Sequence, residues 1–222
     1  MHRDGAWGDA EKAESAAIVR ALQGAARASR VLVLGAGAGR LAYDLHAATE
    51  AAATVALDFN PLLIVVARAV SNGERVALYE RPIAPRAERT LLRTLAAPSP
   101  ARPGLHFVMA DVLRPPLRAA AFDVVLTPWL VDILPERFDT LCARINTLLA
   151  PGGLWLNFGS LAFHSPDPAL RYGLTECVAA LTENGFAAPT VEEHDIAYLC
   201  SPASRHGRRE RIVAWSAAKE RA

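Results

Sequence analysis

Residues 31–40 read V-L-V-L-G-A-G-A-G-R, four apolar residues followed by three alternating glycines. An apolar run of this kind is typical of a strand buried on both faces of a sheet. Gly35, Gly37 and Gly39 would then form a tight turn whose missing Cβ atoms let a ligand approach the backbone. A helix is expected from Leu41 onward, and the N–H groups at its start attract polar ligands. The stretch therefore predicts a nucleotide-cofactor site.

Acidic residues follow the next two expected strands. Residues 53–57 are apolar and end at Asp58, and residues 107–110 end at Asp111. In a Rossmann-like sheet, an acid after the second strand accepts hydrogen bonds from ribose hydroxyls. Dinucleotide oxidoreductases share the glycine turn and this first acid. The acid after the third strand and the L-x-P-G-G turn at 149–153 resemble class I S-adenosylmethionine-dependent methyltransferases instead.

The other expected elements follow from turn signals and apolar periodicity. Residues 74–104 contain five prolines and are interpreted as an irregular insertion with one short helix over about 87–95. The final strand should be well buried, because both of its faces carry apolar residues. In chain order, the remaining elements are a helix from Asn60–Pro61 to Asn72, a strand over 122–127, a helix from Pro135–Glu136 to Leu149, a strand over 154–158, a helix over 173–184 capped by Gly185, and strands over 191–199 and 209–217 joined by a basic loop.

Length and composition favour a single domain in the cytoplasm. A chain of 222 residues fits one full core, which we divide into a leader over 1–30, a cofactor-binding core over 31–160 and a substrate side over 161–222. A net charge of +1 does not indicate nucleic acid or an anionic membrane as a partner. The start has no apolar signal region, and no apolar run is long enough to span a membrane. Three scattered cysteines without C-x-x-C spacing indicate reduced thiols and predict neither a disulfide framework nor a metal site.

With these residues placed, nearly the whole chain resembles one family, the carnosine N-methyltransferase (N2227-like) family. The glycine stretch, V-L-V-L-G-A-G-A-G-R-L-A-Y-D-L, is similar to that family's V-L-V-P-G-A-G-L-G-R-L-A-x-E-I. Its W-x-N-x-G-x-L-x-x-H signature is matched by residues 155–164. Weaker similarities lie in the leader from Arg3 to Glu14, at Asp58–Leu63, and at Trp129–Asp132. The family's tyrosine before the motif histidine is Phe163 here.

The resemblance implies a fold, a cofactor and a reaction. The fold is an α/β, Rossmann-like, seven-stranded sheet, mostly parallel with an antiparallel last strand and helices on both faces. The cofactor is S-adenosyl-L-methionine, with S-adenosyl-L-homocysteine as product. The reaction is in-line methyl transfer to an imidazole nitrogen of a histidine-containing small molecule or peptide. The resemblance implies cofactor contacts at the glycine turn, Asp58, Asp111 and Arg3. The full set of candidate cofactor contacts is Arg3, Gly35, Ala36, Gly37, Gly39, Arg40, Asp58, Phe59, Asp111, Val112 and Thr127. The implied acceptor contacts are Trp129, Asp132, Phe163, His164 and Tyr198, of which Asp132 and His164 are the catalytic candidates.

Several alternatives remain open from the residues themselves. Trp7 could anchor the leader by packing, or the leader could form a lid over the cofactor. An exposed Asp132 could simply cap the next helix, and His164 could be structural or solvated. At the level of function, the rivals are an O- or N-methyltransferase of a specialised metabolite, a non-catalytic partner subunit and, more remotely, a dehydrogenase. The oligomeric state is open, with a homodimer as one option.

Overall fold

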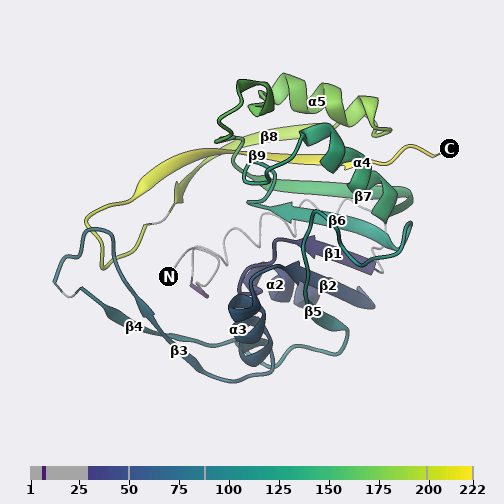
Figure 1. The fold of residues 1–222 in the computed structure, drawn as a ribbon. Helices are drawn as coiled ribbons and strands as arrows, with labels where there is room; N and C mark the ends of the chain where they lie inside the picture. Colours follow the sequence, from purple (N-terminus) through teal and green to yellow (C-terminus); the bar gives the residue numbers. More distant parts are fainter. Residues whose placement is uncertain (1–6, 9–29, 50, 88, 199, 222) are drawn as a thin grey trace.

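The computed structural model describes residues 7–8, 30–49, 51–87, 89–198 and 200–221. Its main feature is a seven-stranded sheet with strand order β5-β2-β1-β6-β7-β9-β8. Neighbouring strands from β5 to β7 pair in parallel, whereas β9 is antiparallel to both β7 and β8. Figure 1 shows this sheet with helices above and below it. The expected Rossmann-like methyltransferase sheet with an antiparallel last strand is therefore confirmed.

Most of the expected elements are present at nearly the expected positions. The helix that was expected from Pro135 begins three residues later, at Phe138, with Arg137 as its N-cap. The strands of the sheet are β1 (Arg30–Leu34), β2 (Ala53–Asp58), β5 (Leu105–Met109), β6 (Phe122–Pro128), β7 (Leu149–Gly159), β8 (Thr190–Tyr198) and β9 (Arg208–Ala218). The α-helices are α2 (Arg40–Ala48), α3 (Pro61–Ser71), α4 (Phe138–Leu148) and α5 (Leu174–Glu183), with a short 3-10 helix at Pro168–Leu170.

The two faces of the sheet are covered by different helices. In β1, Leu32 and Leu34 pack into a core that includes α4 and α5, and Val31 and Val33 pack into a core that includes α2 and α3. This division follows from the period of two in a strand, which sends successive side chains to opposite faces. All four residues are fully buried, so the apolar run is explained by helices on both faces.

The insertion over 74–104 is a β-hairpin, so the predicted short helix at 87–95 is wrong. Strands β3 (Val76–Glu80) and β4 (Leu91–Leu95) pair antiparallel in a separate two-stranded sheet. Leu95 is buried in a small core with Val66 and Val70 of α3. The leucines of 91–95 suit either a helix or a strand by local spacing, and the pairing with 76–80 decides between them.

The hairpin extends away from the main sheet and meets the loop between β8 and β9 (Figure 1). Pro85 and Ser204 form an isolated antiparallel bridge there. At the other end of the chain, the expected leader helix within 9–29 lies outside the described residues. Among the helices that the structure describes, none is both long enough and apolar enough to cross a membrane.

Candidate cofactor and acceptor sites

The loop between β1 and α2 requires glycine for its path. Gly35, Gly37 and Gly39 have φ values of +70°, +55° and +83°, a region that side chains rarely adopt. A Cβ atom on Gly39 would lie 2.6 Å from the Phe107 ring, and one on Gly35 would lie 2.9 Å from Leu130. These two glycines therefore let the loop pack closely against neighbouring side chains. This is a second reason for glycine here, besides the close approach of a ligand that the sequence predicted.

Asp58 fixes this loop at the carboxyl end of β2. Its Oδ2 accepts a hydrogen bond of 2.8 Å from the Gly37 N–H, and its Oδ1 accepts one of 2.8 Å from the Asn60 N–H. The carboxylate is 8% exposed. Charge-assisted hydrogen bonds of this kind are among the stronger ones in proteins. Asp58 thus positions the glycine loop and still presents an acceptor next to it.

Asp111 lies on the neighbouring strand, at the same edge of the sheet. The register of β2 with β5 places Asp58 opposite Met109, and the Ala110 N–H donates to the Asp58 carbonyl at 3.0 Å. Asp111 is exposed, and its Oδ1 accepts the Leu113 N–H at 2.9 Å. The next residue, Val112, is buried. The parallel sheet therefore brings the two predicted cofactor acids to one rim.

The aromatic ring of Phe59 is 77% exposed directly after Asp58. Exposure of a large apolar side chain beside a glycine turn and two acids is what an adenine-binding surface requires. Gly39 is the N-cap of α2 and has no side chain that could accept a hydrogen bond from the first backbone N–H groups of the helix. Together these features fit an adenosyl cofactor.

Trp7 contacts the glycine loop and the start of α2. Its indole N–H donates to the Ala38 carbonyl at 3.0 Å, and its ring lies 5.3 Å from the Tyr43 ring. The Arg40 guanidinium lies 5.4 Å from the Trp7 ring and pairs with Asp44 at 2.6 Å. The anchoring role expected for Trp7 matches this geometry. The other leader residue of interest, Arg3, lies outside the described residues.

Thr127, near the end of β6, makes its side-chain hydrogen bonds inside the core. Its hydroxyl donates to Asn157 Oδ1 at 2.9 Å and accepts the Trp155 indole N–H at 2.9 Å. The residue is fully buried. The side-chain contact with a cofactor that the resemblance implied for Thr127 does not fit this environment, because the hydroxyl is already engaged.

The candidate acceptor rim, by which we mean the strand ends and loops that carry Trp129, Asp132, Ser160, His164 and Tyr198, begins at Trp129, which has a positive φ of +53°. Gly159 makes this possible, since a Cβ atom there would lie 2.9 Å from the Trp129 backbone. The Trp129 ring stacks on the Tyr198 ring, with 4.6 Å between the ring centroids. The Arg208 guanidinium lies 4.6 Å from the centroid of the same Tyr198 ring. Arg208 also pairs with Glu210 at 3.2 Å. Residues 129 and 198, which are distant in sequence, thus form one aromatic surface.

Asp132 follows this aromatic residue in a largely buried position. Burial is the main cause that raises the pKa of its carboxyl group, and the nearby Glu210 raises it further. Hydrogen bonds from its own backbone N–H and from the Ser160 hydroxyl lower the pKa, and so does the nearby His164. Since the N-cap of α4 is Arg137, the helix-capping alternative for Asp132 is wrong.

Two acceptor residues that the resemblance implied differ in their surroundings. His164 is exposed and close enough to Asp132 to influence its charge. The Phe163 ring packs 5.3 Å from Tyr172 and 6.3 Å from Phe138, so it faces the core. The sequence reasoning missed Ser160 and Glu210, and only the W-x-N-x-G motif could have pointed to the position of Ser160.

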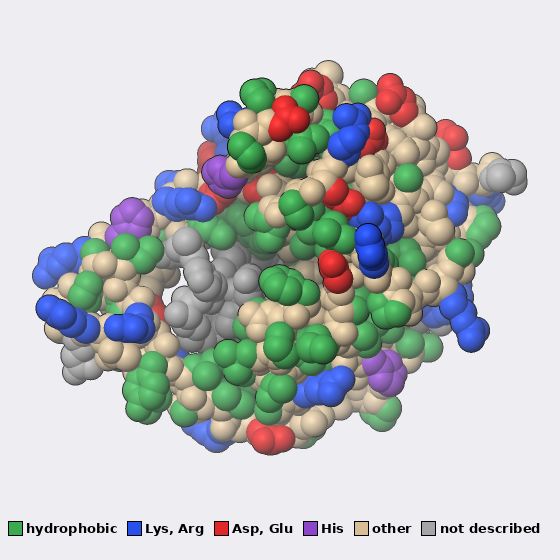
Figure 2. Space-filling model, in the orientation of Figure 1, with side chains coloured by type: hydrophobic (Ala, Val, Ile, Leu, Met, Phe, Trp, Pro, Cys, Tyr) green, Lys and Arg blue, Asp and Glu red, His purple; other side chains and the backbone are tan. Residues whose placement is uncertain are grey.

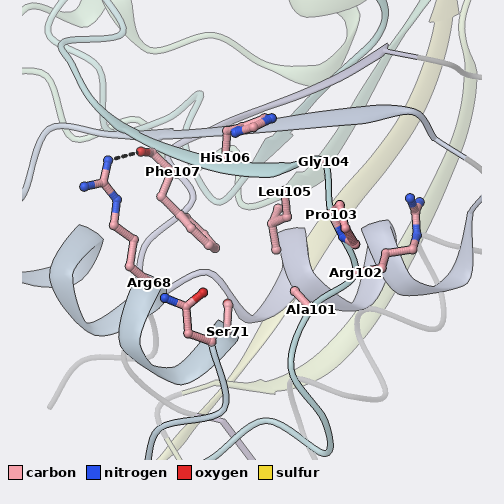
Figure 3. A pocket seen from close by; sticks show the side chains of 10 residues that line it. Arg68, Ser71, Ala101, Arg102, Pro103, Gly104, Leu105, His106 and Phe107 are labelled. Carbon is pink, nitrogen blue, oxygen red and sulfur yellow. Dashed lines mark hydrogen bonds between the residues drawn. The ribbon is translucent and has the colours of Figure 1, made fainter.

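A separate hollow of about 400 Å³ lies beside the beginning of β5 and the C-terminal half of α3 (Figure 3). Arg68 donates to the Phe107 carbonyl there, and Arg102 donates to carbonyls at the end of α2. Its arginines therefore satisfy main-chain groups. Because Asp111 follows the opposite end of β5, this hollow is distinct from the cofactor rim.

The cysteines and other potential metal ligands give no sign of further chemistry. Burial raises the pKa of Cys177 to about 12 and raises that of Cys142 as well, so both thiols stay protonated at neutral pH. Within the described ranges, no group of three or more His, Cys, Asp or Glu side chains is arranged to hold a metal ion.

Comparisons with known proteins agree with this geometry. The family model described as "Methyltransferase domain" matches residues 32–156, from β1 through the strands that form the rim. No curated protein sequence matches the chain. Solved structures also share its fold, at 12–15% sequence identity in the three cases described next.

Three of these structures illustrate the similarity. The YcgJ protein of Bacillus subtilis superposes with a TM-score of 0.65 at 12% identity, covering 95% of this chain and 99% of that one. The N-methyltransferase NodS of Bradyrhizobium japonicum gives 0.60 at 15% identity, covering 95% and 96%. A SAM-dependent methyltransferase of Methanosarcina mazei gives 0.59 at 15% identity, covering 89% and 95%.

The family model covers more than half of the chain and includes the glycine loop, both acids and the P-G-G turn. The chain therefore belongs to the methyltransferase domain family and is a class I S-adenosylmethionine-dependent methyltransferase.

Proposed function

We propose that this methyltransferase acts on an imidazole nitrogen of a histidine-containing small molecule or peptide. The observation that carries the proposal is Asp132, a partly buried carboxylate three residues after Trp129, whose ring stacks on Tyr198. A partly buried carboxylate in the same loop as a flat aromatic surface suits a planar acceptor that has an N–H to donate. The sequence resemblance to the carnosine N-methyltransferase family supports the same acceptor.

In this proposal the cofactor occupies the rim formed by β1, β2 and β5. Asp58 and Asp111 would accept hydrogen bonds from hydroxyl and amino groups of its adenosyl part, and Phe59 would contact the adenine ring. The other residues proposed to hold the cofactor are Gly35, Ala36, Gly37, Gly39, Arg40 and Val112. When bound, S-adenosylmethionine supplies a methyl group on a positively charged sulfur.

Asp132 has two roles toward the acceptor. It accepts the N–H of one imidazole nitrogen and so fixes the tautomer in which the other nitrogen carries the lone pair. It also stabilises the positive charge that develops on the ring, as a carboxylate does for the histidine of a serine-protease triad. Glu210 adds negative potential from β9. An imidazole has a pKa of about 6.5 and is mostly neutral at pH 7, so no stronger base is needed beforehand.

The remaining rim residues orient the acceptor. The Trp129 and Tyr198 rings offer a stacking surface, and in this proposal the exposed His164 binds an acceptor carboxylate. The same stacking surface would suit any planar ring, which favours one second candidate, an O- or N-methyltransferase of an aromatic specialised metabolite. The two candidates differ in their need for Asp132, because only an acceptor with an N–H requires a carboxylate to fix its tautomer.

The test is mass spectrometry of reactions with S-adenosylmethionine and a panel of acceptors. The panel contains histidine, carnosine, histidine-containing peptides, and phenols and amines without imidazole. We expect a gain of one methyl group on imidazole compounds and a loss of turnover of about 10³-fold in Asp132→Asn. The matched control is Asp139→Asn, which removes a carboxylate at the start of α4 and should keep wild-type turnover.

Three results would overturn the proposal. Methylation of non-imidazole acceptors alone would move the function to specialised metabolism. Wild-type turnover in Asp132→Asn would remove the proposed role of the carboxylate. Cofactor binding without transfer to any acceptor would instead support a non-catalytic partner subunit.

A further inference from the structure

Two loops that are distant in the sequence join at the outer end of the hairpin. The Arg86 N–H donates to the Ala203 carbonyl at 2.9 Å, and the Arg205 N–H donates to the Ala84 carbonyl at 2.7 Å. The Arg86 guanidinium adds a hydrogen bond of 3.2 Å to the Ser204 carbonyl. We call this paired region, residues 81–89 and 201–209 as far as they are described, the clasp. Reciprocal main-chain hydrogen bonds give it a defined shape.

The clasp concentrates positive charge. The segments 79–93 and 198–211 contain eight arginines and three glutamates, whereas the rest of the chain has more acidic than basic residues. Figure 2 shows Lys and Arg side chains gathered over this projecting end of the molecule. A net charge of +1 for the whole chain therefore hides a strongly basic region.

Within the part of the chain that the structure describes, the arginines in and around the clasp differ in their acidic partners. Arg93 pairs with Glu80 and Arg208 pairs with Glu210. By contrast, Arg81, Arg89 and Arg205 are exposed, and no carboxylate among the residues that the structure describes pairs with them. Arginines held on a rigid loop without acidic partners favour binding of carboxylate or phosphate groups.

The clasp is continuous with the acceptor rim. Arg208, at the base of the β8–β9 loop, covers the Tyr198 ring, which stacks in turn on Trp129. The β8–β9 loop runs from this stack to the clasp. An acceptor whose reactive ring lies against the stack could therefore extend along the loop toward the clasp. The basic surface is therefore placed to contact parts of an acceptor that extend beyond the methylated group.

Apolar side chains among the arginines indicate the kind of ligand. Ile83 is 72% exposed, and Tyr79 and Leu92, which are paired across β3 and β4, are 67% and 54% exposed. Arginine mixed with aromatic and aliphatic groups is typical of peptide-binding surfaces.

We propose that the clasp binds a short, multiply anionic peptide segment that flanks the methylated residue of the acceptor. This inference rests on the proposed function for the identity of that residue, but binding at the clasp can be measured without methyl transfer. Carboxylate and phosphate groups share the chemistry that arginine recognises, so either could supply the negative charge.

The test measures binding of labelled histidine peptides by fluorescence anisotropy, in the presence of S-adenosylhomocysteine. One peptide carries several glutamates beside the histidine, a second carries glutamines, and a third carries phosphoserines. The clasp variant is Arg81→Gln/Arg89→Gln/Arg205→Gln, which leaves Arg86 and its hydrogen bond intact. The matched control is Arg75→Gln/Arg118→Gln/Arg221→Gln, which removes the same charge from exposed positions elsewhere.

We expect the glutamate peptide to bind the wild type about tenfold more tightly than the glutamine peptide, with an affinity that falls as salt increases. The clasp variant should remove that difference, and the control should keep it. Tighter binding of the phosphoserine peptide would identify phosphate as the preferred group, whereas equal binding would show that carboxylates suffice.

The inference is overturned if the clasp variant binds like the wild type or if the control loses as much affinity. Tighter binding of a short oligothymidylate than of either anionic peptide would also overturn it, in favour of a nucleic-acid surface. Failure of the proposed function looks different. Clasp-dependent binding of the anionic peptides without methylation of any histidine would refute the imidazole acceptor and leave the clasp intact.

Discussion

The cofactor rim and the acceptor rim lie on one sheet but are built in different ways. The candidate cofactor rim consists of the glycine loop after β1, Asp58 at the end of β2 and Asp111 after β5. Each of these parts is formed by a few consecutive residues. The acceptor rim combines Trp129 after β6, Ser160 after β7, and Tyr198 and Glu210 on β8 and β9. The first rim is thus defined by local backbone requirements, and the second by long-range packing. Substitutions should therefore affect stability and cofactor binding in the first region, and acceptor use in the second.

The largest expected effect is in the glycine loop. Gly39→Ala places a side chain at a φ of +83° and a Cβ atom 2.6 Å from the Phe107 ring. We expect a loss of about 3 kcal/mol in the free energy of unfolding and no measurable binding of S-adenosylmethionine. Urea unfolding and titration calorimetry give both values. In Gly173→Ala, where φ is −78° and the nearest atom is 3.5 Å away, the loss should stay below about 1 kcal/mol. Equal losses in the two variants would contradict the local explanation.

The two cofactor acids should separate stability from binding. Asp58→Ala removes two charge-assisted hydrogen bonds to the Gly37 and Asn60 N–H groups, so we expect a loss of about 2 kcal/mol in stability and more than about tenfold in cofactor affinity. Asp111→Ala removes one hydrogen bond at an exposed site and should weaken cofactor binding with less than about 1 kcal/mol lost in stability. Wild-type affinity in both variants would refute their assignment to the cofactor.

A smaller effect is expected at the acceptor rim. Tyr198→Ala removes the ring that stacks on Trp129, and we expect a rise in the acceptor KM, with about 1 kcal/mol lost in stability. Because Tyr198 lies away from the glycine loop, the affinity for the cofactor should not change. Tyr198→Phe keeps the ring and serves as the control in steady-state kinetics. A change in cofactor affinity without a change in KM would contradict the division between the two rims.

The smallest effect concerns stability and pH at Asp132. Its pKa is raised in the folded protein, so the folded state binds a proton more readily than the unfolded chain. Ionised Asp132 therefore destabilises the fold as pH rises above the ordinary aspartate pKa, and this penalty is absent below it. We expect Asp132→Asn to melt at or above the wild-type temperature at pH 7, and the gap to close near pH 4. A clear loss of stability at pH 7 would show that the carboxylate supports the fold instead.

The reason why the hairpin was missed is physical. The residues of β4 have no local signal that separates a strand from a helix, and their partner β3 lies more than ten residues away. The start of α4 was also misplaced, since the residues after Pro135 remain in a turn before Phe138. In both places, contacts with other parts of the chain override the local preference.

By itself, the sequence determined the Rossmann-like sheet, the methyltransferase family and the positions of Asp58 and Asp111. These features depend on glycines with positive φ, on buried apolar runs and on acids at strand ends, and each is encoded within a few residues. Only the tertiary structure decided the joining of Trp129 with Tyr198, the environment of Asp132 and the clasp. Those features depend on β8, β9 and the hairpin, whose pairing over long sequence separations is set by the packed core and not by any local pattern.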